Sequence, residues 1–254
     1  VDYRDTRLNS HSGTNARGTF TFNGTSTGFD FADFLLGLPQ LTSVQYGSAT
    51  YRFRSNSWGG FLQDDWRILS RLTLNLGLRY DYASPVSEAN DRLVNLDVAN
   101  DFSAVAPVLP GESGPFSGAY PEGLINPDRN NWSPRIGLAW RAFNRMIVRA
   151  GYGISYNTNV YASMAQQLAI QPPFTFTQTN IASALLPLTL QNGFPVASAL
   201  TVTNNFGVDR DYRIGYAQTW NLNVQRELPS GLLMNIDYTG TKGTHLDMLQ
   251  APNR

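Results

Sequence analysis

Few residues of this sequence combine the types and the spacing that catalysis requires. Asp64 and Asp65 are adjacent carboxylates, and paired carboxylates can perform acid–base chemistry. Neighbouring side chains of a strand point to opposite faces, so these two cannot share a proton as a catalytic dyad does. The two histidines, His11 and His245, lie far apart in the chain, and neither has a second histidine nearby. We therefore predict no catalytic residue and no metal site.

Cofactor and nucleic-acid chemistry are also disfavoured. Gly151-x-Gly153 looks like part of a phosphate-binding loop, but it lies inside an alternating strand pattern rather than at a strand-to-helix turn. The chain has no cysteine, which excludes disulfides, thiolate metal sites and cysteine nucleophiles. Among 254 residues, 19 Lys and Arg balance 19 Asp and Glu, so the basic excess of a nucleic-acid-binding protein is missing. We expect no cofactor, no nucleic-acid partner and no enzymatic activity.

Alternation of apolar and polar residues organises most of the remaining sequence. Between residues 72 and 82 every even-numbered side chain is apolar, and the odd-numbered positions hold Thr, Asn, Gly, Arg and Asp. Side chains of a strand alternate between two faces, so this period predicts a strand with one apolar and one polar face. The pattern recurs over 132–140, 146–156, 219–225 and 232–239, and more weakly over 58–66. The last of these extends back through Tyr51 and Phe53, and residues 19–22 are expected to end a further strand.

The length of these strands indicates a membrane protein. Several run to about eleven residues, against a mode of about 5–6 for strands in general. Eleven residues at about 3.3 Å each, tilted near 45°, rise roughly 25 Å, which is the height of the apolar band of an outer-membrane barrel. Aromatic side chains gather toward the strand ends, as they do in the girdles at the headgroup level. No run of 18 apolar residues occurs, so a transmembrane helix is not expected.

These patterns predict outer-membrane lipid on the even-numbered face and a lumen on the odd-numbered face. The lipid-facing or girdle candidates are Leu74, Leu76, Leu78, Tyr80, Trp140, Val148, Tyr152, Trp220, Leu222 and Tyr238. The lumen-facing candidates are Asn75, Arg79, Asp81, Arg135, Arg149 and Asn223. Polar groups on the lumen face stay hydrated or pair with a plug, and the glycines beside them leave room.

Short and long connections alternate along the chain. Residues 68–71, 142–145 and 228–231 are predicted as tight turns of three antiparallel hairpins. Between the hairpins lie 83–132 and 157–215, each on the order of fifty residues, which is unusual for a soluble domain. Outer-membrane barrels have short periplasmic turns and long extracellular loops. We expect the long connections to be extracellular.

The long connections have some pattern of their own. Apolar spacing predicts one short helix from Phe31 to Leu38, ended by Pro39, and another from Tyr161 to Leu168. Residues 106–127 are rich in Pro and Gly and are expected to be irregular. The candidates for exposed aromatic side chains that capture a ligand are Tyr120, Trp132, Tyr161, Phe174, Phe176 and Phe206.

Four segments spread over most of the chain carry the motifs of one known family. Gly-Gly-Phe-Leu-Gln-Asp-Asp-Trp-Arg over 59–67 precedes Leu-Thr-Leu-Asn-Leu-Gly-Leu-Arg-Tyr over 72–80, and 32–39, 132–156 and 218–245 fit as well. Together they resemble TonB-dependent outer-membrane receptors, and more narrowly the Oar-like group. The resemblance implies a 22-stranded barrel with a plug. About seven or eight strands are predicted here, so residues 1–254 are expected to form a partial barrel domain, without the plug and the remaining strands.

For the full-length protein, the resemblance implies a transporter in the bacterial outer membrane. Loops and plug would bind a scarce ligand, which the sequence leaves unidentified, and the TonB complex would displace the plug. Two alternatives stay open: a passive porin-like channel, and a soluble β-sandwich module for carbohydrate binding or adhesion. An upstream plug distinguishes the transporter from a porin, and dependence on detergent distinguishes both from a sandwich. The chain begins with neither Met nor a signal peptide, and we expect a fragment.

Overall fold

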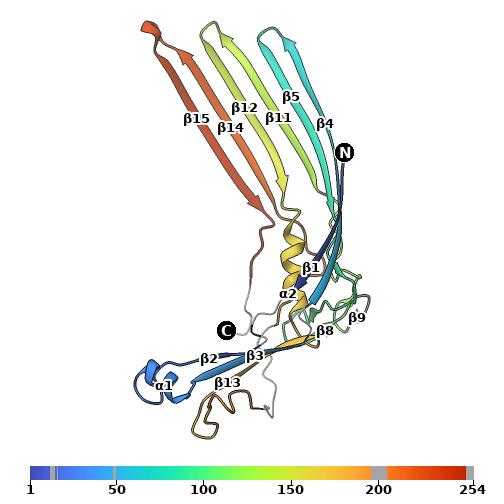
Figure 1. The fold of residues 1–254 in the computed structure, drawn as a ribbon. Helices are drawn as coiled ribbons and strands as arrows, with labels where there is room; N and C mark the ends of the chain where they lie inside the picture. Colours follow the sequence, from blue (N-terminus) through green and yellow to red (C-terminus); the bar gives the residue numbers. More distant parts are fainter. Residues whose placement is uncertain (12–14, 16, 48–49, 196–204, 250–254) are drawn as a thin grey trace.

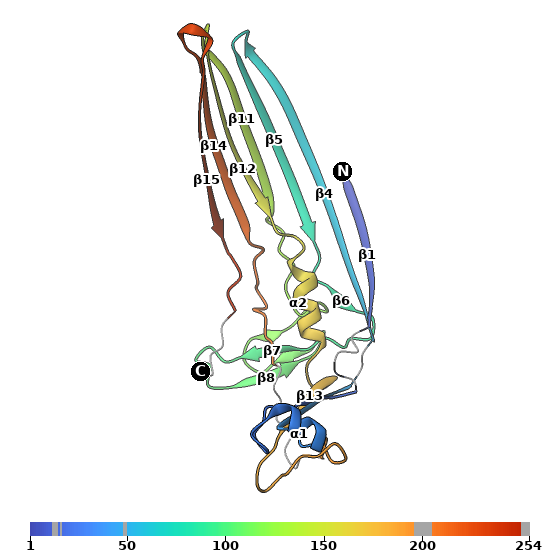
Figure 2. The same cartoon turned by 60° about the vertical axis from the view of Figure 1, so that its left-hand side comes forward.

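A single open sheet of long antiparallel hairpins dominates the computed structural model, which describes residues 1–11, 15, 17–47, 50–195 and 205–249 (Figures 1 and 2). Its strands neighbour one another in the order β1-β4-β5-β11-β12-β14-β15, and the two-residue β6 also pairs with β4. Their bounds are Asp2–His11 (β1), Thr50–Leu69 (β4), Leu72–Ala83 (β5), Ser87–Glu88 (β6), Trp132–Phe143 (β11), Met146–Tyr156 (β12), Tyr216–Glu227 (β14) and Leu233–Thr244 (β15). The all-β antiparallel class and the strand count agree with the prediction.

Tight turns join the strands at one end of the sheet, and the long connections leave from the other. The turns link β4 to β5, β11 to β12, and β14 to β15, where the 3-10 turn Pro229–Gly231 lies. These are the three predicted hairpins. A third long connection joins β1 to β4 at the opposite end, because His11 pairs with Thr50. We call the two ends the turn end and the loop end.

Strand β4 changes the side on which its apolar residues lie. Toward the turn end, Trp58, Leu62 and Trp66 are the partners of Tyr82, Leu78 and Leu74, so all six share one face. Toward the loop end, Tyr51 and Phe53 lie on the opposite face and are buried. The predicted extension of this strand through Tyr51 and Phe53 is confirmed. The apolar residues of β4 change face because other segments of the chain pack on the opposite face at the loop end.

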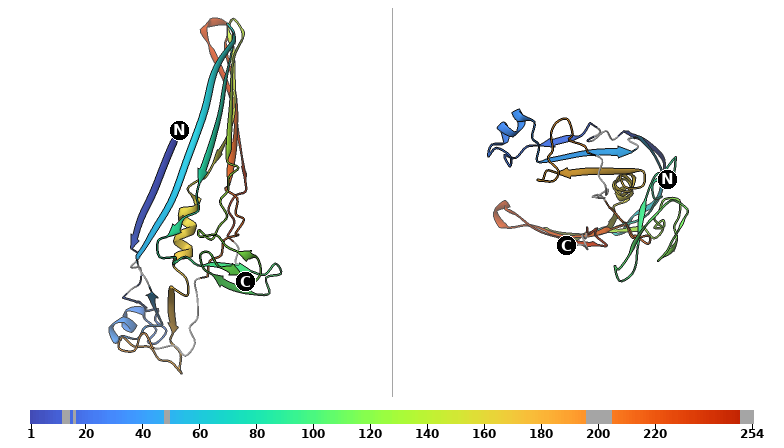
Figure 3. Two further views of the ribbon diagram at one scale, coloured as in Figure 1. Left: turned by 90° about the vertical axis from the view of Figure 1, so that its right-hand side faces the viewer. Right: turned by 90° about the horizontal axis from the view of Figure 1, so that it is seen from below.

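Those segments form a second body, which we call the loop lobe (Figure 3). Its elements are β2 (Thr19–Thr21), α1 (Asp30–Leu36), β3 (Leu41–Gly47), β7 (Asn95–Val98), β8 (Val105–Val108), β9 (Ser113–Gly114), β10 (Gly118–Ala119), α2 (Val160–Ala169) and β13 (Thr175–Ile181). The strands pair in three small antiparallel sheets, β13-β3-β2, β7-β8 and β10-β9. Among the described residues, no helix is long and apolar enough to cross a membrane.

The hydrophobic core lies at the loop end and not in the long hairpins. It contains Tyr51, Phe53, Ala83, Val86, Leu93, Val108, Tyr120, Leu124, Ile125, Val160, Tyr161, Met164, Ala165, Leu168, Ala169 and Ile214. Helix α2 contributes the stripe at i, i+3, i+4 and i+7 that begins at Tyr161, which confirms the second predicted helix. Within the hairpins the sheet is one layer thick, so it contributes few buried side chains there.

Two buried amides hold the loop lobe together. Asn95 donates to the carbonyl oxygens of Leu124 and Val208, and its own oxygen accepts from the N–H groups of Leu96 and Val208. Gln171 donates to the carbonyls of Val94 and Phe206 and accepts from the N–H of Phe206. These amides supply backbone groups with partners where no strand ladder does, because a buried polar group without a partner is costly.

The expectations about the long connections hold in part. Residues 19–21 form the expected strand, β2, which pairs with β3 inside the loop lobe and not with the main sheet. The first predicted helix ends at Leu36, where Gly37 adopts a left-handed conformation (φ 65°), before Pro39 is reached. The Pro- and Gly-rich stretch 106–127 is not simply irregular, because it contributes Val108 and Leu124 to the core. Strand β1 was not predicted, because its apolar and polar residues do not alternate.

Candidate functional site

The ten residues predicted to face lipid all lie on one face of the main sheet, which we call the apolar face. Cross-strand pairs connect them: Leu74 with Leu138, Trp140 with Val148, Tyr152 with Trp220, and Leu222 with Tyr238. Leu76 and Leu222 remain 38% and 43% exposed, and Leu74 and Val148 are half-buried. None of these four is sealed between two sheets. The β-sandwich alternative is therefore wrong for this chain.

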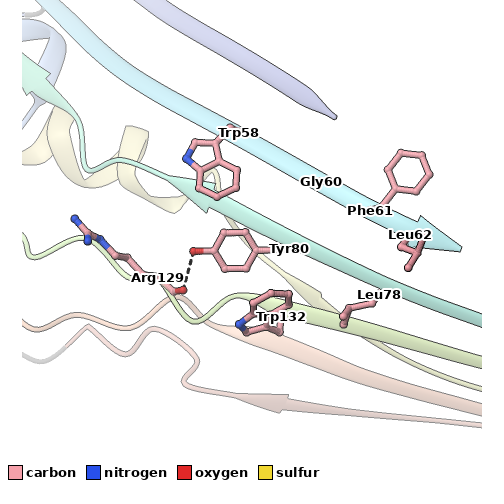
Figure 4. A pocket seen from close by; sticks show the side chains of 8 residues that line it. All are labelled: Trp58, Gly60, Phe61, Leu62, Leu78, Tyr80, Arg129 and Trp132. Carbon is pink, nitrogen blue, oxygen red and sulfur yellow. Dashed lines mark hydrogen bonds between the residues drawn. The ribbon is translucent and has the colours of Figure 1, made fainter.

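Aromatic side chains form two rows on the apolar face. At the loop end, the ring of Tyr80 lies 5.0 Å from that of Trp58 and 4.6 Å from that of Trp132, and its hydroxyl donates to the carbonyl of Arg129 (2.8 Å) (Figure 4). Nearer the turn end, Trp66 is the partner of Leu74, and Trp140 is the partner of Leu72. All five tryptophans of the chain, Trp58, Trp66, Trp132, Trp140 and Trp220, lie on this face. Two aromatic rows flanking an apolar band match the girdles of an outer-membrane barrel.

A glycine on the apolar face provides the first test of this packing. A Cβ at Gly240 would fall on the indole of Trp220, its cross-strand neighbour, whereas a Cβ at Gly60 would meet nothing within 4 Å. We expect Gly240→Val to cost about 1–3 kcal/mol of folding stability, because the indole must leave its site, and Gly60→Val to be nearly neutral. The measurement is urea unfolding of each full-length variant in lipid vesicles, and equal stabilities would contradict the packing.

The six residues predicted to face the lumen all lie on the opposite face, which we call the polar face. Asn75 donates to Asp65 (2.6 Å), and Arg79 forms ion pairs with Asp81 (2.7 Å) and with Asp2 (3.3 Å). Arg135 is the cross-strand partner of Gly77 on one side and of Gly153 on the other, and an ideal Cβ at either glycine would lie 3.5 Å from its side chain. A Cβ at either glycine would make an ordinary van der Waals contact with this side chain.

A second polar cluster spans three neighbouring strands. Arg149 on β12 donates to Asn223 (3.4 Å) and Gln225 (3.3 Å) on β14. Asn223 donates in turn to Asn235 and Asp237 on β15. Asn235 and Asp237, like Asp2, were not among the predicted lumen residues. The signal for the first two was present, because they occupy odd-numbered positions of the last hairpin.

The other candidate reactive groups do not converge. Asp64 and Asp65 point to opposite faces, as predicted: Asp64 is the partner of Leu76, and Asp65 that of Asn75. His11 contacts Thr50 (3.0 Å), and the ring of His245 lies 5.8 Å from that of Tyr216. Within the part of the chain that the structure describes, no group of three His, Cys, Asp or Glu residues could hold a metal ion.

The aromatic residues proposed for ligand capture are mostly packed in the loop lobe. Tyr120 and Tyr161 are buried, and burial raises the pKa of the Tyr161 phenol to about 12. Phe174, Phe176 and Phe206 are half-buried. Trp132 is exposed but belongs to the aromatic row of the apolar face. For Tyr120 and Tyr161 the expected exposure is wrong, because each contributes its ring to the core of the lobe.

Two buried carboxylates brace the loop lobe. Burial acts to raise the pKa of Glu88. Hydrogen bonds from the Arg92 side chain and from the N–H groups of Arg52, Asn90 and Arg92 act in the opposite direction. The hydrogen bonds outweigh the burial, so the pKa of Glu88 lies below its ordinary 4.5. Asp97 is held in the same way by Ser117, Phe116 and Tyr120, and its pKa lies below its ordinary 3.8. Each carboxylate thus stabilises the fold only while it is ionised.

These shifts predict an acid-sensitive lobe. A group whose folded pKa is depressed stabilises the fold at a pH above its ordinary pKa, and this contribution is lost as the pH falls through the folded pKa. We expect the lobe to open progressively below about pH 4.5, and the double variant Glu88→Gln/Asp97→Asn to show a flatter dependence on pH. Limited proteolysis of the full-length protein across this range measures the effect. A lobe that becomes more resistant in acid would contradict the assignment.

Comparisons with known proteins agree with a sheet that has one apolar and one polar face. The model of the outer membrane beta barrel domain family matches residues 1–254. Over 98 residues, 37% of this chain, the sequence is 35% identical to the TonB-dependent transporter Oar of Myxococcus xanthus, and the match covers 9% of that protein. No solved structure matches the chain. The chain belongs to the outer membrane beta barrel domain family, and its place is the bacterial outer membrane.

Proposed function

We propose that this chain forms part of the barrel wall of a TonB-dependent transporter, which takes up a scarce ligand through the outer membrane. The two faces of the sheet are the observation that carries the proposal. The apolar face, with its two aromatic rows, contacts lipid, and the polar face lines the lumen. The partial identity with Oar supports the TonB-dependent class.

The arrangement of the polar face favours a plugged lumen. Its charged groups include Arg79, Arg135, Arg149, Asp65, Asp81 and Asp237, and cations and anions are interspersed. Such a surface offers ion-pair and hydrogen-bond partners to a protein domain that fills the barrel. In this orientation the turn end is periplasmic and the loop lobe is extracellular, where it meets the ligand first. The chain itself performs no covalent chemistry in this proposal.

Conductance and TonB binding test the proposal together. The full-length protein, inserted in a planar lipid bilayer, should show no open-channel current, because the plug fills the lumen. It should also bind the purified periplasmic domain of TonB. A passive porin-like channel gives a steady current and no TonB binding. A protein that is monomeric in water without detergent contradicts both membrane functions.

A further inference from the structure

One aromatic side chain stands alone on the polar face. Phe61 of β4 is 64% exposed and is the cross-strand partner of Arg79, whereas the next residue, Leu62, belongs to the apolar face. Figure 4 shows Phe61 and Leu62 projecting to opposite sides of the strand. Along β4 the neighbours of Phe61 on its own face are Gly59 and Gln63, so the ring has no apolar neighbour in its strand.

The polar face has a gap beside this ring. Gln63, Gly77 and Arg135 are successive cross-strand partners on β4, β5 and β11. Neighbouring strands lie about 4.8 Å apart, so the backbones of Gln63 and Arg135 are separated by roughly 10 Å. Between them, Gly77 has no side chain. The gap therefore has bare backbone as its floor, Phe61 on its loop-end side, and a polar side chain at each flank.

The two polar side chains at the flanks are free. Arg79 and Arg149, the other two arginines predicted to face the lumen, have partners on this face. Among the described residues, no hydrogen bond or ion pair engages the side chain of Gln63 or Arg135, and both side chains are exposed. The carboxylate of Asp65, two residues from Gln63, already accepts a hydrogen bond from β5 (2.6 Å). The gap thus offers an amide and a guanidinium that has no counter-charge.

The position of the gap along the sheet suits a ligand that arrives from outside. On the polar face of β4, small residues at 55, 57 and 59 separate Phe61 from Phe53, which packs in the core of the loop lobe. The hydrogen-bonded groups Asp65 and Arg149 lie nearer the turn end. A ligand that passes the loop lobe therefore reaches Phe61 before these groups.

We propose that this gap binds an acidic saccharide, with a pyranose ring against Phe61, a hydroxyl at Gln63 and the carboxylate at Arg135. The C–H groups on one face of a pyranose suit the electron-rich face of an aromatic ring. A guanidinium donates two parallel hydrogen bonds to a carboxylate, and an amide both donates to and accepts from hydroxyls. An acidic peptide supplies the carboxylate but no C–H ring face. The proposal names a substrate class for the function proposed above and rests on the polar face lining the lumen.

The experiment uses trigalacturonic acid and neutral galactotriose as the probes. Each is titrated calorimetrically into the full-length protein in phosphatidylcholine nanodiscs. We expect the acidic probe to bind about tenfold more tightly, with a preference that falls as salt rises. Arg135→Gln should remove this preference by weakening only the acidic probe, and Arg135→Lys should lose less. Phe61→Ala should weaken both probes about fivefold, because each loses the aromatic surface.

The matched controls are Arg141→Gln and Leu62→Ala. Arg141 is exposed on the same strand as Arg135 but lies at the turn end, where its N–H donates to the carbonyl of Arg71, and Leu62 lies on the apolar face. Neither change should alter binding, and heat-modifiable mobility on gels shows whether each variant is folded. Absence of binding, equal affinities for the two saccharides, equally tight binding of triglutamate, or an equal loss in Arg141→Gln would overturn the proposal. Conductance and TonB binding are measured without saccharide, so the two proposals fail separately.

Discussion

Replacing Leu76 with arginine should cost about 2–4 kcal/mol of folding stability in a membrane, whereas the same replacement at Asn75 should cost less than about 1 kcal/mol. Leu76 lies on the apolar face, four residues from both Tyr80 and Leu72, whose partners Trp132 and Trp140 belong to the two aromatic rows. It therefore sits near the middle of the band, where a guanidinium loses its water. Each position has a carboxylate as its cross-strand partner, Asp64 for Leu76 and Asp65 for Asn75, so the difference between the two variants reports the surroundings of each face and not the presence of an anion.

Adjacent positions make this comparison well controlled. Both variants gain the same side chain in the same strand but lose different ones, so Leu76→Ala and Asn75→Ala serve as references that subtract the loss of each native side chain. The measurement is urea unfolding of the full-length protein in phosphatidylcholine vesicles, followed by heat-modifiable mobility on gels. Equal losses at the two positions, or a larger loss for Asn75→Arg, would show that lipid does not contact the apolar face.

Asn95→Leu should produce the largest local effect, about 3 kcal/mol or more, because it leaves several buried backbone groups without partners. The amide of Asn95 is fully buried and bonds to both backbone groups of Val208 and to the carbonyl of Leu124. Leucine has a similar volume but offers no donor or acceptor. The segment around Val208 should then detach from β7, while the main sheet stays folded.

Hydrogen exchange of the full-length protein measures this opening residue by residue. Amides near Leu96 and Val208 should exchange faster, and amides of β12 and β14 should keep their protection. The control is Asn100→Leu, because Asn100 is exposed in the turn that follows β7. Loss of protection throughout the main sheet, or no loss at Val208, would contradict the role assigned to Asn95.

The sequence predicted the long hairpins well because their physics is local. A strand with lipid on one side and polar surroundings on the other must alternate, so Leu74, Asn75 and Leu76 reveal their faces without knowledge of any partner strand. The tight turns limit the register of each hairpin. Even-numbered residues of both strands then lie on one face of the sheet, and odd-numbered residues lie on the other. Even so, Asp237 was not named as a lumen residue despite its odd-numbered position, and its hydrogen bonds with Asn223 and Asn235 depend on the pairing of β14 with β15.

The loop lobe was predicted poorly because its structure depends on contacts distant in the sequence. Tyr120 and Tyr161 look like exposed loop aromatics until α2 packs against β4 and the segment 105–125. Strand β1 carries no alternation, and its pairing with β4 becomes evident only in the sheet. Arg7 and Arg54 are likewise 47 positions apart and meet only through the register of β1 on β4.

Spin labels placed one at a time at residues 73, 74, 75 and 76 offer the most direct measurement of which face touches hydrocarbon. Residues 1–254 contain no cysteine, so a cysteine introduced there is the only thiol of this segment, and any cysteine elsewhere in the full-length protein is first replaced by serine. In lipid vesicles, labels at Leu74 and Leu76 should collide readily with dissolved oxygen and little with a water-soluble nickel chelate. Labels at Thr73 and Asn75 should collide less with oxygen. The opposite alternation, or none, would contradict contact between lipid and the apolar face.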